Sequence, residues 1–70
     1  MDLQNNRIKM SRLIKTPEAK EIIIREFPEL NNPLMIMLAK RMTLDEVLEF
    51  ARGRAPEEKV RRTLEELERL

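Results

Sequence analysis

The sequence predicts an all-α fold, a compact orthogonal bundle of four to five short helices with no sheet. Apolar residues recur at helical spacing, and start signals such as Thr-Pro-Glu, Asn-Asn-Pro and Thr-x-x-Glu precede them. Three consecutive isoleucines at residues 22–24 would also suit a strand, but no second strand-like segment exists to pair with one. We therefore expect helices near residues 9–15, 17–26, 33–42, 44–52 and 56–69.

The first segment is polar and shows no sustained period. We expect residues 1–8 to form a flexible N-terminal tail, and residues 9–70 to form a single helical domain. In the first helix Met10, Leu13 and Ile14 share a face, while Ile8 points elsewhere.

Each of the next two helices has a cap followed by proline. Thr16 is expected to cap the second helix, and Asn32 the third, because both precede a proline at the first helical position. The third helix is the most apolar segment, and we expect it to lie at the centre of the fold. Its predicted inward stripe is Leu34, Met35, Leu38, Ala39 and Met42.

The last two helices are bounded by other signals. Thr43 and Glu46 have the spacing of a capping box, and Gly53 is the residue type that commonly follows a helix end. On the exposed faces, acids precede bases by four residues, which predicts the pairs Glu21/Arg25, Glu57/Arg61, Glu58/Arg62 and Glu65/Arg69.

The predicted core follows from these stripes. Leu38 should lie on the central helix and face the core. We therefore expect Leu38→Ala to lower the free energy of unfolding by about 2 to 5 kcal/mol. The predicted core residues are Leu13, Ile14, Ile22, Ile23, Phe27, Leu34, Leu38, Met42, Leu44, Val47, Leu48, Val60, Leu64 and Leu67.

Composition argues against catalysis. The 70 residues include no cysteine and no histidine, which removes disulfides, thiolate metal sites and the usual general base near neutral pH. We expect no enzyme activity, no cofactor and no metal. The formal charge is +1 with many charges of both signs, and no apolar run is long enough to span a bilayer. We therefore expect a cytoplasmic protein that does not bind membranes.

Nucleic-acid binding is the alternative function. The helices expected at residues 44–52 and 56–69 have the spacing of a helix-turn-helix. However, the second of these helices would bring five glutamates to the phosphates, and no aromatic side chain is free to stack on bases.

A protein partner is the interpretation that we favour. Ile36 and Met37 lie opposite the predicted inward stripe of the third helix, beside Lys40 and Arg41. An exposed apolar patch with a basic rim would suit an acidic partner, either another protein or the acidic last helix of a second copy in a homodimer. The predicted site is therefore Ile36, Met37, Lys40 and Arg41.

A family resemblance supports the same fold. The elements Pro17-Glu18, Phe27-Pro28, Asn32-Pro33 and Thr43-Leu44 occur in series from about Met10 to Leu70. In this series the chain resembles a small all-helical domain family of unknown function, the hybrid-cluster-protein-associated redox-disulfide domain. That family is similar to the N-terminal domain of iron-sulfur cluster repair proteins. Its members occur alone or fused to sensor or hemerythrin-like domains.

The chain departs from that family at two places. Glu26 stands where the family usually has glycine, and Phe27-Pro28-Glu29-Leu30 replaces the loop that bears a Cys-x-x-Cys pair in some members. The chain thus resembles the branch without cysteines. The resemblance implies an all-α orthogonal bundle and an unassigned function, and it carries over no redox function. We expect a non-catalytic interaction or accessory domain.

Overall fold

A computed structural model describes all residues, 1–70, and contains helices joined by short turns. The all-α prediction is confirmed, because the chain forms no sheet and only two isolated β-bridges. None of the helices combines the length and the apolar character needed to cross a membrane. The elements are α1 (Met10–Lys15), α2 (Pro17–Glu26), the 3₁₀ helix η1 (Pro28–Leu30), α3 (Pro33–Ala39), α4 (Leu44–Ala51) and α5 (Glu57–Glu68).

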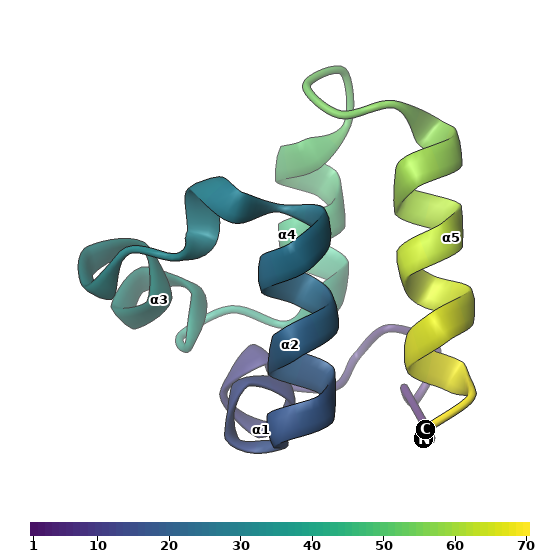
Figure 1. Cartoon of the computed structure of the whole chain (residues 1–70), viewed down its shortest axis with the longest axis horizontal. Helices are drawn as coiled ribbons and strands as arrows, with labels where there is room; N and C mark the ends of the chain where they lie inside the picture. Colours follow the sequence, from purple (N-terminus) through teal and green to yellow (C-terminus); the bar gives the residue numbers. More distant parts are fainter.

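Helix α2 occupies the centre of the bundle. It packs against α1 at one end and against α5 along its side. In Figure 1, α2, α4 and α5 run up and down the view, whereas α1 and α3 are seen nearly end-on. The bundle therefore contains crossing directions, with α3 at its left edge in this view.

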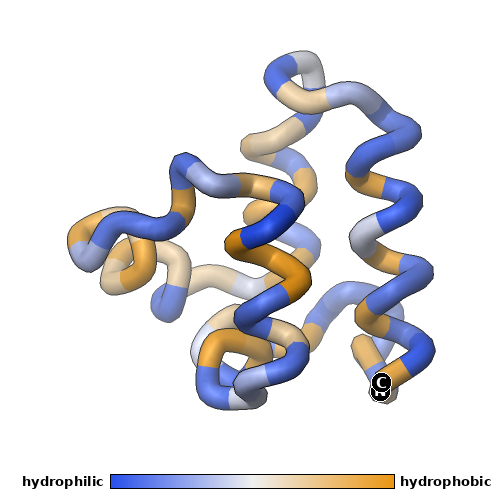
Figure 2. The backbone as a smooth tube through the Cα atoms, viewed as in Figure 1, coloured by the Kyte–Doolittle hydropathy of each residue, from blue (hydrophilic) through white to orange (hydrophobic).

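The prediction that residues 33–42 form the central helix is wrong. In α3 only Ala39 is buried, and the predicted core residues Leu34 and Leu38 are 59% and 49% exposed. Figure 2 shows this apolar helix at the edge of the molecule. The side that faces the other helices carries Met35, Ile36 and Ala39 instead. Since α3 is apolar around most of its circumference, periodicity alone did not distinguish its two faces.

Helix α3 also ends three residues earlier than predicted. The Met42 carbonyl accepts a hydrogen bond of 2.9 Å from the Met10 amide, and the Leu44 amide donates to the Ile8 carbonyl at 2.8 Å. These two bonds form the β-bridge between Lys9 and Thr43. The chain after Ala39 therefore leaves the helix to join the starts of α1 and α4.

The N-terminal segment belongs to the domain, which corrects the predicted boundary at residue 9. Leu3 and Ile8 are only 5% and 1% exposed and lie in the same core cluster as residues of α1 and α2. The turn between them is made by Gln4, Asn5 and Asn6, which all have positive φ angles. Asparagine tolerates this left-handed conformation better than most residues. The turn therefore directs both apolar side chains inward.

One hydrophobic cluster holds the helices together. Of the predicted core, Leu13, Ile23, Leu44 and Leu67 are buried, and most of the others pack against the cluster from partly buried positions. Leu34 and Leu38 are exposed, and Phe27 and Val60 are partly exposed and lie outside this cluster. The cluster consists of Leu3, Ile8, Met10, Leu13, Ala19, Ile23, Leu44 and Leu67.

Two of the three predicted side-chain caps are confirmed. The Asn32 side chain accepts a hydrogen bond from the Leu34 amide, and Thr43 and Glu46 form the reciprocal capping box. Gly53 has φ 81°, the left-handed geometry expected after a helix end. Thr16 does not cap α2, because its hydroxyl donates instead to the Arg12 carbonyl of α1 at 3.0 Å.

Candidate binding surfaces

The first candidate is the outward side of α3, which we call the α3 outer face and define as Leu34, Met37 and Leu38. Their exposed fractions are 59%, 53% and 49%. They occupy positions i, i+3 and i+4, which share one side of a helix. Three large apolar side chains therefore lie together on one exposed side of a short helix.

The structure divides the four residues predicted to bind a partner. Met37, Lys40 and Arg41 are exposed, and neither basic residue forms an ion pair. Ile36 instead lines a small internal space with residues of α1 and α2, such as Ile14 and Ile24. Ile36 is therefore partly buried, and the α3 outer face includes Leu34 and Leu38 in its place.

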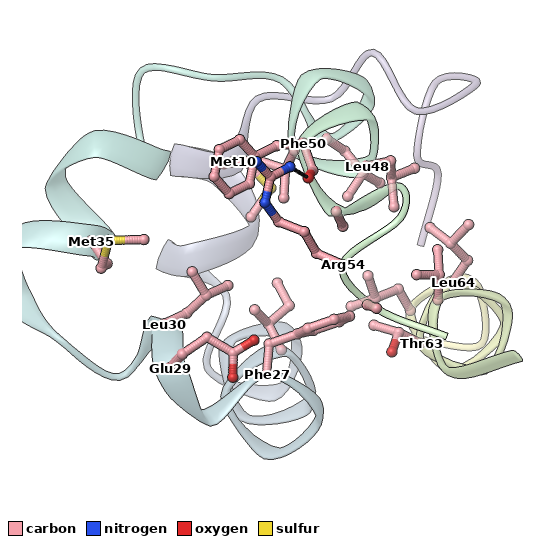
Figure 3. A pocket seen from close by; sticks show the side chains of 17 residues that line it. Met10, Phe27, Glu29, Leu30, Met35, Leu48, Phe50, Arg54, Thr63 and Leu64 are labelled. Carbon is pink, nitrogen blue, oxygen red and sulfur yellow. Dashed lines mark hydrogen bonds between the residues drawn. The ribbon is translucent and has the colours of Figure 1, made fainter. Parts of the chain in front are cut away.

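The second candidate is a cleft between α2, α4 and α5, which the sequence analysis did not predict. Its volume is about 200 Å³, and 14 of the 17 residues that line it are hydrophobic. Figure 3 shows Phe27 and Leu30 on one wall, Phe50 and Leu48 on the facing wall, and Leu64 and Met35 at the two ends. We call this space the apolar cleft.

Three polar residues line the apolar cleft. The Thr63 hydroxyl donates to the Lys59 carbonyl at 2.8 Å, so its hydrogen-bonding capacity is used within α5. Glu29 and Arg54 are exposed and form no ion pair. The cleft therefore has an apolar interior, and its charged groups lie at the surface.

Two cations lie over aromatic rings at this site. The Arg54 guanidinium carbon is 4.4 Å from the Phe50 ring centroid, and its Nη1 donates to the Phe50 carbonyl at 2.7 Å. The Lys59 ammonium is 5.1 Å from the Phe27 ring centroid. Both rings line the cleft. Cation–π contacts restrain the two basic side chains and leave their charge uncompensated by any carboxylate.

The volume of the apolar cleft is large relative to the stability of a small domain. At about 24 cal/mol per Å³, an enclosed cavity of this size would destabilise the fold by roughly 5 kcal/mol. The total free energy of unfolding of a protein domain is only about 5 to 15 kcal/mol. The cleft opens to solvent, so the real penalty is smaller. A group that filled it would still stabilise the domain.

Charged residues between α2 and α5 have a structural role. Glu26 is 9% exposed, and its Oε1 accepts a hydrogen bond of 2.7 Å from Arg62 Nη2. Arg25 pairs with Glu26 and with Glu66 of α5. None of the four pairs predicted within single helices therefore forms: Arg25 and Arg62 bind other acids, and Glu65 pairs with Arg61 rather than with Arg69.

No feature favours the helix-turn-helix alternative. Figure 1 shows α4 and α5 running in opposite directions, whereas the helices of that motif cross at about 90–120°. No group of three or more acidic side chains is placed to hold a metal ion. The α3 outer face and the apolar cleft both present mainly apolar side chains.

No family model, no curated protein and no solved structure matches this chain. The resemblance to the hybrid-cluster-associated domain therefore remains a prediction.

Sequence reasoning missed the apolar cleft for a physical reason. Many of the residues that line it lie on regular apolar stripes, for example Val47 and Leu48 in α4 or Val60 and Leu64 in α5. A stripe shows which side of a helix faces inward, but it does not show how closely two helices approach. The one available signal was Phe50, which lies beside the α4 stripe and is 58% exposed.

Proposed function

We propose that this chain is a cytoplasmic, non-catalytic protein-interaction domain that binds its partner through the α3 outer face. The observation that supports it is the exposure of Leu34, Met37 and Leu38, each close to half or more. A 70-residue chain has few apolar side chains to spare for its surface, because its core is small. Leaving three of them on one helix is expected where a partner covers them.

The rim of this surface indicates the kind of partner. Lys40 and Arg41 follow α3 directly, are exposed, and form no ion pair. Interfaces commonly combine an apolar centre with a polar rim, and opposite charges at the rim speed association. We therefore propose a partner protein whose own apolar patch is flanked by acidic residues. The habit of the resembled family, whose members occur alone or fused to other modules, is consistent with this role.

Site-specific photocrosslinking tests the proposal. A photoreactive amino acid replaces Met37, the full chain is expressed and illuminated in cells, and covalent adducts are identified by mass spectrometry. The control carries the same group at Glu65, an exposed position on α5. In Figure 1, α5 lies on the opposite side of the view from α3.

We expect adducts from position 37 that are absent from position 65 and that disappear when Leu38→Asp is added. An adduct with twice the mass of the chain would identify a second copy as the partner, and light scattering of the purified protein would then show a dimer. Equal adducts from both positions, or none from position 37, would contradict the proposal.

A further inference from the structure

We propose that the apolar cleft is a binding site for a small amphipathic carboxylate, such as a medium-length fatty acid. Its alkyl chain would lie among Phe27, Leu48 and Leu64, and its carboxylate would contact Arg54 and Lys59. This site is separate from the α3 outer face, whose side chains point away from the cleft lining. The inference therefore does not depend on the proposed protein partner.

The volume and the lining of the cleft indicate which apolar group the ligand would carry. A volume of about 200 Å³ accommodates roughly seven groups of the size of a water molecule, each about 30 Å³. Water itself is a poor occupant, since 14 of the 17 lining residues are hydrophobic and the one hydroxyl, that of Thr63, already donates to the Lys59 carbonyl. An unbranched chain of about eight carbons matches both the volume and the absence of hydrogen-bonding groups.

The charges beside the cleft determine the head group. Arg54 and Lys59 are restrained over the rings of Phe50 and Phe27, and neither has an acidic partner. Arg54 uses Nη1 for the Phe50 carbonyl, which leaves other N–H groups free for a carboxylate. Because the guanidinium is already held in place, a carboxylate bound to it would order little additional side chain.

Acidic side chains also lie near the cleft and oppose the binding of an anion. Glu29 is the one acid in the cleft lining, and it should weaken the binding of an anion. Glu57 and Glu58 line a neighbouring open concavity together with Arg54. The proposal therefore predicts opposite effects for neutralising Arg54 and for neutralising Glu29.

The test is a titration of the full chain followed by NMR, with three ligands that share an eight-carbon chain: octanoate, 1-octanol and octylammonium. We expect all shift changes to concentrate on cleft residues such as Met35, Leu48 and Leu64. Octanoate should bind at least about fivefold more tightly than octylammonium, as expected for an anion beside the Arg54 guanidinium at an exposed site. Equal affinities of these two ligands, or shift changes centred elsewhere, would overturn the proposal.

Variants test the named residues. Arg54→Gln should weaken octanoate binding about fivefold and leave octanol binding unchanged, whereas Glu29→Gln should strengthen octanoate binding. Arg12→Gln is the matched control, because it removes the same charge from an exposed residue of α1. If Arg12→Gln weakens octanoate binding as much as Arg54→Gln does, only net charge matters and the site is wrong. Circular dichroism confirms that each variant is folded.

A titration with a fourth ligand distinguishes a free small molecule from the C-terminus of a protein chain. N-acetyl-leucine presents a carboxylate on a branched side chain, as a C-terminal leucine would. Weaker binding of N-acetyl-leucine than of octanoate supports a small amphipathic ligand. Tighter binding would overturn that assignment in favour of a peptide terminus.

Discussion

The Glu26 carboxylate at the end of α2 accepts a hydrogen bond of 2.7 Å from the Arg62 guanidinium in α5. The two residues are 36 positions apart in the sequence, so this bond connects two helices that are distant along the chain. Arg25 contacts the same carboxylate at 3.5 Å. The hydrogen bond from Arg62 is the main reason why the pKa of Glu26 lies below its ordinary value, and partial burial opposes the shift.

This lowered pKa predicts a loss of stability in acid. The ordinary pKa of glutamate is about 4.3, so above that pH the charged Glu26 stabilises the folded state fully. As the pH falls through the lower pKa of the folded state, Glu26 becomes protonated and its contribution is lost. We expect the melting temperature, followed by circular dichroism, to fall steeply below about pH 4.

Glu26→Gln tests the source of this pH dependence. The variant should melt at a lower temperature than the wild type at pH 7, and the difference should narrow as the pH falls. The melting temperature of Glu26→Gln should still depend somewhat on pH, because the backbone hydrogen bond from Thr43 also lowers the pKa of Glu46. The control is Glu65→Gln, which removes a partner of the more exposed Arg61 and should change little. If the difference in melting temperature between the wild type and Glu26→Gln stayed the same across the pH range, Glu26 would not be the source of the pH dependence.

Leu13 and Leu38 offer a matched pair of identical substitutions. Leu13 has no exposed surface, so Leu13→Ala leaves a cavity and should lower the free energy of unfolding by about 2 to 5 kcal/mol. Leu38 is 49% exposed, so Leu38→Ala should cost less than about 1 kcal/mol, in contrast to the sequence-based expectation. Urea titrations measure both values. A larger loss for Leu38→Ala would mean that α3 packs with the opposite face inward.

The sequence predicted helix positions well because the start signals are local. Asn32 and Thr43 cap the helices that follow them, and Pro17 and Pro33 stand at first helical positions as expected. Such signals depend on a few neighbouring residues and need no knowledge of the rest of the chain. The predicted and observed starts of all five helices consequently agree within one residue.

The sequence did not predict features that depend on distant contacts. The interhelical pairing of Arg62 with Glu26 competes with the predicted pairing with Glu58, and only the packing of α5 on α2 decides between them. The burial of Glu26, which is 9% exposed, also depends on this packing, since glutamate is rarely buried unless it is paired. The facing direction of α3 and the width of the apolar cleft are likewise set by how whole helices meet.

Thr43 and Thr16 both precede a helix, but only Thr43 caps its helix with a side-chain hydrogen bond. The Thr43 hydroxyl accepts a hydrogen bond from the Glu46 amide at 3.2 Å, so Thr43→Ala should cost about 1 kcal/mol and lower the melting temperature by about 4 to 8 °C. Thr16 makes no capping bond, so Thr16→Ala should have a smaller effect. Thermal unfolding of both variants checks the difference. Equal losses would show that Thr16 also acts as a cap in solution.

Ile8 tests whether the N-terminal segment is part of the folded domain. Its side chain is 1% exposed within the core cluster, and its carbonyl accepts a hydrogen bond of 2.8 Å from the Leu44 amide at the start of α4. Ile8→Ala should therefore lower the free energy of unfolding by about 2 to 5 kcal/mol, a loss large enough to unfold much of a marginally stable domain. The neighbouring Arg7 is exposed, so Arg7→Ala should leave the unfolding curve nearly unchanged. If both substitutions proved equally harmless, residues 1–8 would be a tail outside the domain, as the sequence had suggested.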